Sequence, residues 1–174
     1  MAVFANDEVS WTRIDYATIA GDGLACVELR RHDECRAWLE RRHYRIVTID
    51  CALGLPALCK QLSDIFDWPA QFGYEFAGHS LDALRDGFTF AIPDEGGVVL
   101  MLLRPDALWT AERSFMDGLF AIAAEHTRRQ MAEGKRFFTI LLLERDSQLP
   151  GATIEPRQIP ALWWQPGPGS PFRE

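Results

Sequence analysis

Three runs of strand length are spaced along the middle of the chain. Residues 44–50 are rich in β-branched side chains, and residues 98–103 and 137–143 are almost continuously apolar. A strand that is covered on both faces has such a continuous run, whereas a strand with one solvated face alternates between apolar and polar positions. The pattern therefore predicts buried strands of a parallel sheet.

Helical patterns lie between these runs. Apolar positions recur at helical spacing over residues 54–66, and the pair Trp68-Pro69 ends this helix because a residue before proline is pushed out of the α region. The stretch after it is rich in aromatic residues and glycine and is expected to be irregular. Ser80 is the candidate N-cap of a short helix over residues 80–88.

A long helix is predicted over residues 111–133, with Thr110 as its N-cap and Gly134 as its stop. Upstream, residues 24–29 and 33–42 predict a further strand and helix. Buried strands that alternate with helices form parallel sheets through right-handed crossovers. We therefore expect an α/β fold with a small, layered parallel sheet of three to four strands flanked by helices.

The chain divides by composition into three parts. Residues 1–43 are read as an N-terminal extension with a possible added strand-helix unit, and residues 44–144 as the main domain. Residues 145–174 form a tail that holds six of the ten prolines, and Trp163-Trp164 within it are expected to dock onto the domain. The apolar runs are too short to span a bilayer and the start lacks a signal-peptide pattern, so we expect a cytoplasmic protein.

Enzyme signatures are scarce. The sequence has no phosphate-binding glycine loop, no nucleophile elbow and no zinc-protease motif. The four cysteines form no C-x-x-C pair and are interpreted as packed, reduced side chains. The four histidines are far apart, and none has a second metal ligand at a recognised spacing. We therefore expect no catalytic residues, no metal and no cofactor.

The net charge of −7 disfavours nucleic acid and membrane surfaces as partners, because both reward clustered Lys and Arg. A basic protein fits better. The charge is also unevenly placed. Residues 61–103 contain seven acidic residues against Arg85 alone, a net charge of −6.

Asp82 and Asp86 carry the most informative part of this charge. Four residues apart on a helix they share a face, where like charges destabilise by about 0.2–0.5 kcal/mol. Arg85 offsets some of this repulsion. The residues alone leave two readings open, a solvated acidic face and a partner-binding face.

The segment Leu81-Asp-Ala-Leu-Arg-Asp86 resembles the barstar family, in which an aromatic residue and a glycine precede a short helix of this pattern. The order of predicted elements over residues 44–144 agrees with the resemblance. It implies a barstar-like fold and a protein that inhibits a microbial ribonuclease without doing chemistry. In that family an acidic helix and the loop before it plug the basic active site, and the matching positions here are Asp82 and Asp86.

The leading hypothesis is therefore a barstar-like inhibitor of a basic ribonuclease, or of another basic protein, that gives immunity to a toxin. The residues expected to bind the partner lie on the acidic helix and the preceding loop: Asp82, Asp86, Arg85, Glu75, Phe76, Gly78 and His79.

Two alternatives belong to other classes. The first is a barstar-like scaffold that serves as a non-inhibitory interaction module, with the N-terminal unit and the Trp163-Trp164 pair as its contact surface. The second is an enzyme that binds a divalent metal such as Mg²⁺ through a cluster of hard oxygen ligands. Its candidate ligands are Asp64, Asp67, Asp82 and Asp86.

Overall fold

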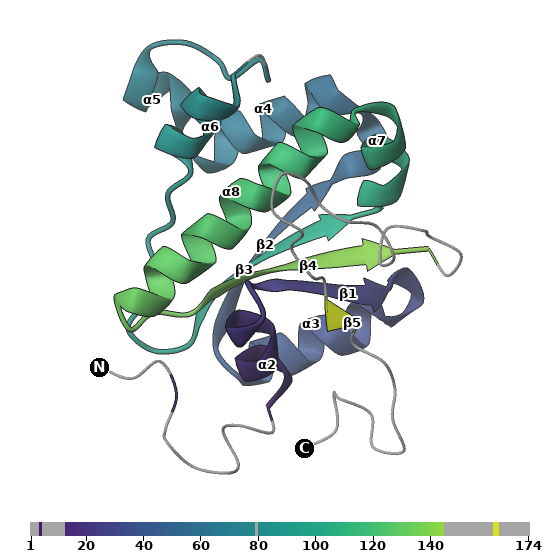
Figure 1. The fold of residues 1–174 in the computed structure, drawn as a ribbon, viewed down its shortest axis with the longest axis vertical. Coiled ribbons are helices and arrows are strands. Elements are labelled where there is room, and N and C mark those ends of the chain that lie inside the picture. Colours follow the sequence, from purple (N-terminus) through teal and green to yellow (C-terminus); the bar gives the residue numbers. More distant parts are fainter. Residues whose placement is uncertain (1–3, 5–12, 79, 145–161, 164–174) are drawn as a thin grey trace.

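The computed structural model describes Phe4 and residues 13–78, 80–144 and 162–163. Its centre is one parallel sheet with the strand order β2-β3-β4-β1-β5 (Figure 1). The strands are β1 (Leu24–Glu28), β2 (Tyr44–Asp50), β3 (Gly97–Leu103), β4 (Phe137–Leu143) and the two-residue β5 (Leu162–Trp163). The predicted α/β class and small parallel sheet are confirmed.

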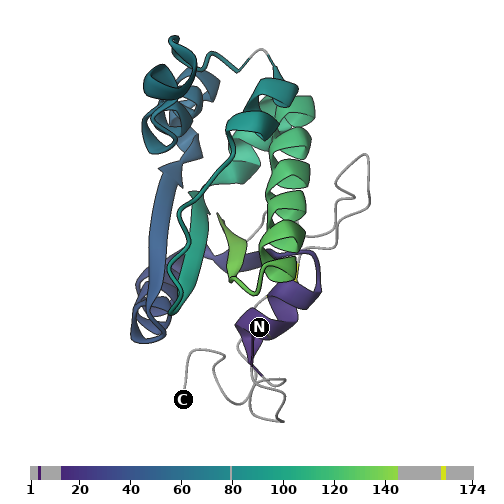
Figure 2. The ribbon, with the colours of Figure 1, turned by 90° about the vertical axis from the view of Figure 1, so that its left-hand side faces the viewer.

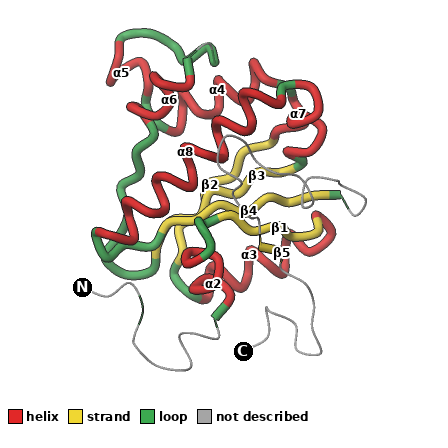
Figure 3. Tube along the Cα trace, viewed as in Figure 1, coloured by secondary structure: helices red, strands yellow, loops and turns green. Residues whose placement is uncertain are grey.

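Helix α2 precedes the first strand, and the other described helices lie between strands along the chain. They are α2 (Ile14–Ala20), α3 (His32–Arg41), α4 (Leu55–Ile65), α5 (Trp68–Phe72), α6 (Leu81–Gly87), α7 (Pro105–Ala111) and α8 (Arg113–Ala132), with short 3-10 turns η1 (Leu29–Arg31) and η2 (Cys51–Leu53) (Figure 3).

The sheet has a hydrophobic core on each face. Successive residues of a strand point to opposite faces, and in β3 Leu100 packs into one core while Met101 packs into the other. Helices α4–α8 cover the first core, and α2 and α3 cover the second. Figure 2 shows α8 lying alongside the sheet. Every residue of β4 is buried, as its apolar run predicts.

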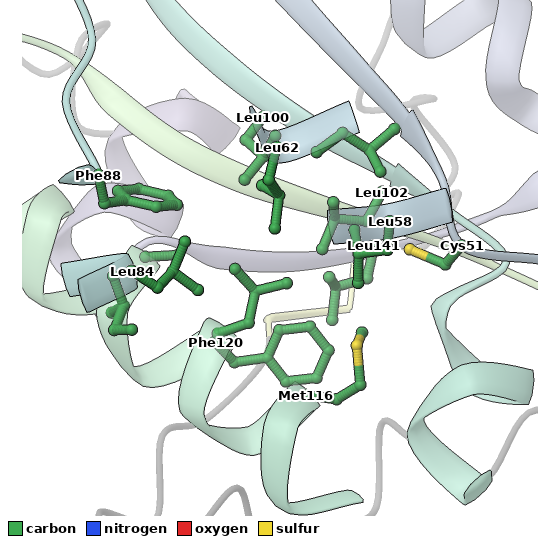
Figure 4. Close-up of a cluster of buried hydrophobic side chains, with 14 of the residues drawn as sticks. Cys51, Leu58, Leu62, Leu84, Phe88, Leu100, Leu102, Met116, Phe120 and Leu141 are labelled. Carbon is green, nitrogen blue, oxygen red and sulfur yellow. The ribbon is translucent and has the colours of Figure 1, made fainter. Parts of the chain in front are cut away.

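The larger core joins α6 to the sheet. Figure 4 shows Leu84 and Phe88, from α6 and the residue after it, facing the same cluster as Leu62 of α4 and Phe120 of α8. All four side chains are essentially inaccessible to solvent. The acidic helix is thus anchored to the same core that holds the strands.

Three expectations about helices are corrected. Trp68-Pro69 does follow the end of α4, but the next residues form α5 and are not irregular: Asp67 turns the chain with a left-handed conformation, and Pro69 sits in the first turn, where its missing N–H is harmless. The predicted long helix is α8, which begins at Arg113 rather than at residue 111, after a separate helix α7 that was not predicted. Thr110 therefore lies inside α7, where its hydroxyl donates to the carbonyl of Asp106 at 3.0 Å, and it caps nothing.

The N-terminal part of the chain joins the same sheet. The expected strand over 24–29 is β1, which pairs in parallel with β4, and the expected helix over 33–42 is α3, with Cys35, Trp38 and Leu39 buried. Helix α2 was not predicted. Its buried Asp15 accepts a hydrogen bond of 2.6 Å from the Tyr44 hydroxyl, which ties α2 to the start of β2.

Candidate functional site

Helix α6 begins where the sequence predicts. Ser80 precedes it in an extended conformation, and its hydroxyl accepts a hydrogen bond of 3.1 Å from the backbone N–H of Ala83. This bond satisfies one of the donors that a helix leaves open at its first turn. Ser80 is therefore the N-cap, and the register of the acidic residues is fixed from the first turn.

Close contacts hold α6 against its neighbours. A Cβ placed on Gly87 would lie 2.3 Å from the buried indole of Trp68, and one on Gly118 of α8 would lie 2.4 Å from Leu81. Leu84, between these two contacts, is fully buried. Glycine thus allows α6 to approach both α5 and α8, and the helix presents its outer face from a fixed platform.

The outer face of α6 consists of Asp82, Arg85 and Asp86, all of which are exposed. Arg85 forms an ion pair of 2.9 Å with Asp82, whose side chain is 92% exposed, and a longer one of 3.3 Å with Glu125 of α8. Among the described residues Asp86 forms no ion pair. The face of α6 therefore carries two carboxylates and, together with Glu125 of α8, surrounds one guanidinium with three, of which only Asp86 has no ion pair among the described residues.

Glu125 was not expected from the sequence. It lies 40 residues from Arg85, on the helix that the sequence predicts over residues 111–133. Only the packing of α6 across α8 brings the two side chains together. The only indication of its role in the local sequence is that Glu125 lies away from the buried face of α8.

Packing and hydrogen bonds with α4 and α5 hold the loop before α6 in place. Phe76 is buried and packs on Trp68 with a centroid distance of 4.7 Å. Its backbone N–H donates to the Ser63 hydroxyl, which in turn donates to the exposed Glu75 carboxylate at 2.6 Å. Phe76 therefore supports the loop, while Glu75 reaches its surface.

The end of this loop depends on Gly78, which has a φ of 78°. A Cβ at Gly78 would lie 2.5 Å from the Sγ of Cys59. Both the backbone conformation and this close approach require glycine. His79, the next predicted site residue, lies outside the described residues.

Two aromatic side chains near α6 are exposed. Phe72 is 39% and Tyr74 54% accessible, and both lie against the buried ring of Trp68. Phe72 also borders Gly87 at the end of α6. The sequence showed an aromatic-rich stretch here but not which rings face solvent.

The other acidic residues of the 61–103 segment are dispersed. Asp64 pairs with Lys60 on α4 at 3.3 Å, and Asp67 occupies the turn between α4 and α5. Asp94 and Glu95 lie in the long loop that leaves α6 and runs beside α8 to the start of β3 (Figures 1 and 3). The charge of −6 is therefore not one patch.

The carboxylates proposed as metal ligands are not brought together. Within residues 13–78 and 80–144, which include all four, no group of three or more His, Cys, Asp or Glu side chains is placed to hold a metal ion. The metal-enzyme hypothesis gains no support from the structure. The described cysteines are free and buried, in agreement with packing roles.

Beneath the end of α6 lies a buried histidine that the sequence did not distinguish. His126 of α8 is 3% exposed and packs edge-on against Phe137 at 4.6 Å, beside Phe88. Its Nδ1 lies 2.8 Å from the Arg129 guanidinium, so this nitrogen must be the unprotonated acceptor. Burial, and secondarily Arg129, lowers the pKa of His126 to about 4.

Comparison of the chain with models of protein families, with curated proteins and with solved structures finds no match. No helix in the described part of the chain is both long and apolar enough to cross a membrane.

Proposed function

We propose that the protein binds a basic protein partner through the outer face of α6 and the loop before it, and that this partner is a ribonuclease whose active site the face blocks. The resemblance of residues 81–86 to the barstar family motivates the choice of a ribonuclease. The observation that carries the proposal is the exposed carboxylate of Asp86, which has no ion pair within the described part of the chain, on a helix fixed by close contacts.

Electrostatics supports a basic partner. A ribonuclease site that binds phosphate is itself positively charged, so a carboxylate face imitates the charge of the substrate. Asp86 and Asp82 stand on one face, with Glu125 beside them through Arg85. Complementary charge speeds association, and this effect falls with salt because exposed charges are screened over about 8–10 Å at ordinary ionic strength.

The fixed position of α6 supports tight binding. Side chains that must be ordered on association reduce affinity. Here the helix is capped by Ser80, wedged at Gly87 and anchored by Leu84 before any partner arrives. Only the exposed side chains themselves need to adjust.

The test is a binding and inhibition assay with a panel of small basic ribonucleases, including any encoded beside the gene. We expect one of them to bind, to lose RNA cleavage on binding, and to associate more slowly at high salt. Asp86→Ala should weaken binding at least tenfold. Asp94→Ala removes the same charge from an exposed position beyond α6 and should change little.

Equal effects of Asp86→Ala and Asp94→Ala would show that the face of α6 is not the binding site. Binding without loss of RNA cleavage would instead favour the non-inhibitory interaction module.

A further inference from the structure

A pocket of about 580 Å³ opens between α4 and the loop that leads into α6. Helix α4 contributes Leu55, Pro56, Cys59 and Lys60 to its lining, and the loop contributes Glu75, Phe76 and Ala77. We propose that this pocket receives an apolar side chain of the same basic partner that the face of α6 binds. The inference rests on the proposed function and adds the apolar anchor of the interface.

The charged groups of the pocket already have partners. The Lys60 ammonium lies 3.3 Å from the Asp64 carboxylate, and the Glu75 carboxylate accepts the hydrogen bond from Ser63. Burial raises the pKa of the Cys59 thiol to about 11, so at neutral pH it is an uncharged, weakly polar group. The rest of the pocket lining that a ligand would contact is mostly hydrocarbon, and this favours an apolar occupant.

The walls of the pocket are fixed before binding. Phe76 is anchored against Trp68, and Gly78 brings the loop so close to Cys59 that no side chain would fit between them. A preformed pocket spares the partner the cost of ordering a loop. It is therefore suited to a single anchoring side chain rather than to a diffuse contact.

The pocket and the acidic face lie within one interface. Ala77 and Asp82 are five residues apart, and a chain spans at most about 3.6 Å per residue, so their Cα atoms are at most about 18 Å apart. A standard interface covers about 800 Å² on each partner and reaches both. An apolar pocket beside exposed charges matches the apolar centre and polar rim of specific interfaces.

The first experiment needs no partner. The protein is titrated with N-acetyl-phenylalanine amide and, separately, N-acetyl-arginine amide, while the amide resonances are followed by NMR. We expect the phenylalanine probe to shift the resonances of Cys59 and Ala77 with saturation in the millimolar range. Ala77→Phe places a ring in the pocket where the probe would bind and should abolish these shifts, whereas Ala132→Phe, the same change at an exposed alanine of α8, should not.

Shifts that persist in Ala77→Phe, or that the arginine probe reproduces at the same residues, would overturn the apolar assignment. With a ribonuclease that binds, Ala77→Phe should weaken affinity about tenfold and leave its salt dependence unchanged, whereas Asp86→Ala should reduce that dependence. An ineffective Asp86→Ala would refute the proposed function alone, because the probe titration decides the pocket independently.

Discussion

Helices α3 and α6 both carry charged side chains at the surface, but the ion pairs that these side chains form are different. On α3 the exposed Arg36 pairs with Glu40 at 2.9 Å, and Glu34 pairs at the same distance with the mostly buried Arg31 of the preceding turn η1. On α6 the only base, Arg85, serves two carboxylates, and Asp86 has no ion pair among the described residues. Acidic side chains that outnumber their basic partners, on a helix held in place by close contacts, therefore distinguish α6 as a candidate binding surface from an ordinary solvated helix.

The two helices are also anchored differently. Helix α3 buries a stripe of three side chains, Cys35, Trp38 and Leu39, against the sheet. Helix α6 is shorter and buries Leu84, and it depends on the close approach at Gly87. Its position is therefore more sensitive to a single added methyl group.

The largest effect of a single substitution on stability at neutral pH is expected for Gly87→Ala. Alanine in a helix is ordinarily about 1 kcal/mol more favourable than glycine. Here the new methyl group would overlap the fully buried indole of Trp68, and overpacking of this kind costs typically 1–3 kcal/mol. We expect a net loss of up to about 2 kcal/mol in the free energy of unfolding, measured by urea denaturation with tryptophan fluorescence. A gain in stability would show that α6 is not wedged at this contact.

The second effect concerns the histidine beneath α6, which has no counterpart beneath α3. In the unfolded chain His126 takes up a proton below its ordinary pKa of 6.5, whereas in the folded protein it does so only near pH 4. Stability is therefore expected to fall between pH 6.5 and pH 4, by roughly 3 kcal/mol.

Urea midpoints at pH 7 and pH 4.5 measure this fall. His126→Phe should remove its share of the pH dependence, because phenylalanine does not titrate. Ala132→Phe, which introduces the same ring at an exposed position of α8, should retain the wild-type dependence. If both variants keep the same dependence as the wild type, the buried imidazole is not its source.

The smallest effect on stability is expected from the ion pairs themselves. Arg36→Ala on α3 and Arg85→Ala on α6 should each change the free energy of unfolding by less than about 1 kcal/mol, since exposed pairs contribute little. Their effects on binding should differ. Arg85→Ala frees Asp82 and Glu125 and should raise the association rate with a basic ribonuclease at low salt, as stopped-flow measurements would show. A slower rate would mean that Arg85 itself contacts the partner.

Much of the fold could be predicted because its signals are local. The strands over 44–50, 98–103 and 137–143 and the cap at Ser80 follow from runs and residue types that are adjacent in sequence. Helix α7 was missed, and its separation from α8 depends only on the observed conformation of Glu112, a residue that is no helix breaker.

The candidate site was predictable in part for the same reason. Asp82, Arg85 and Asp86 share a face by helical periodicity alone. How the charge of Arg85 is shared on that face depends on Glu125, which belongs to another helix, α8, and also pairs with Arg85. Likewise, nothing local separates the buried Phe76 from the exposed Tyr74 two residues earlier.

The sequence by itself determined the α/β class, the parallel strands and the concentration of acid around α6, because continuous burial and charge density are properties of neighbouring residues. Only the tertiary structure decided that the acidic residues are dispersed, that Asp86 has no ion pair in the part of the chain that the structure describes, that His126 is buried and that a pocket lies beside the loop. Each of these depends on contacts between segments far apart in the chain, since burial and charge compensation are set by what packs against a side chain.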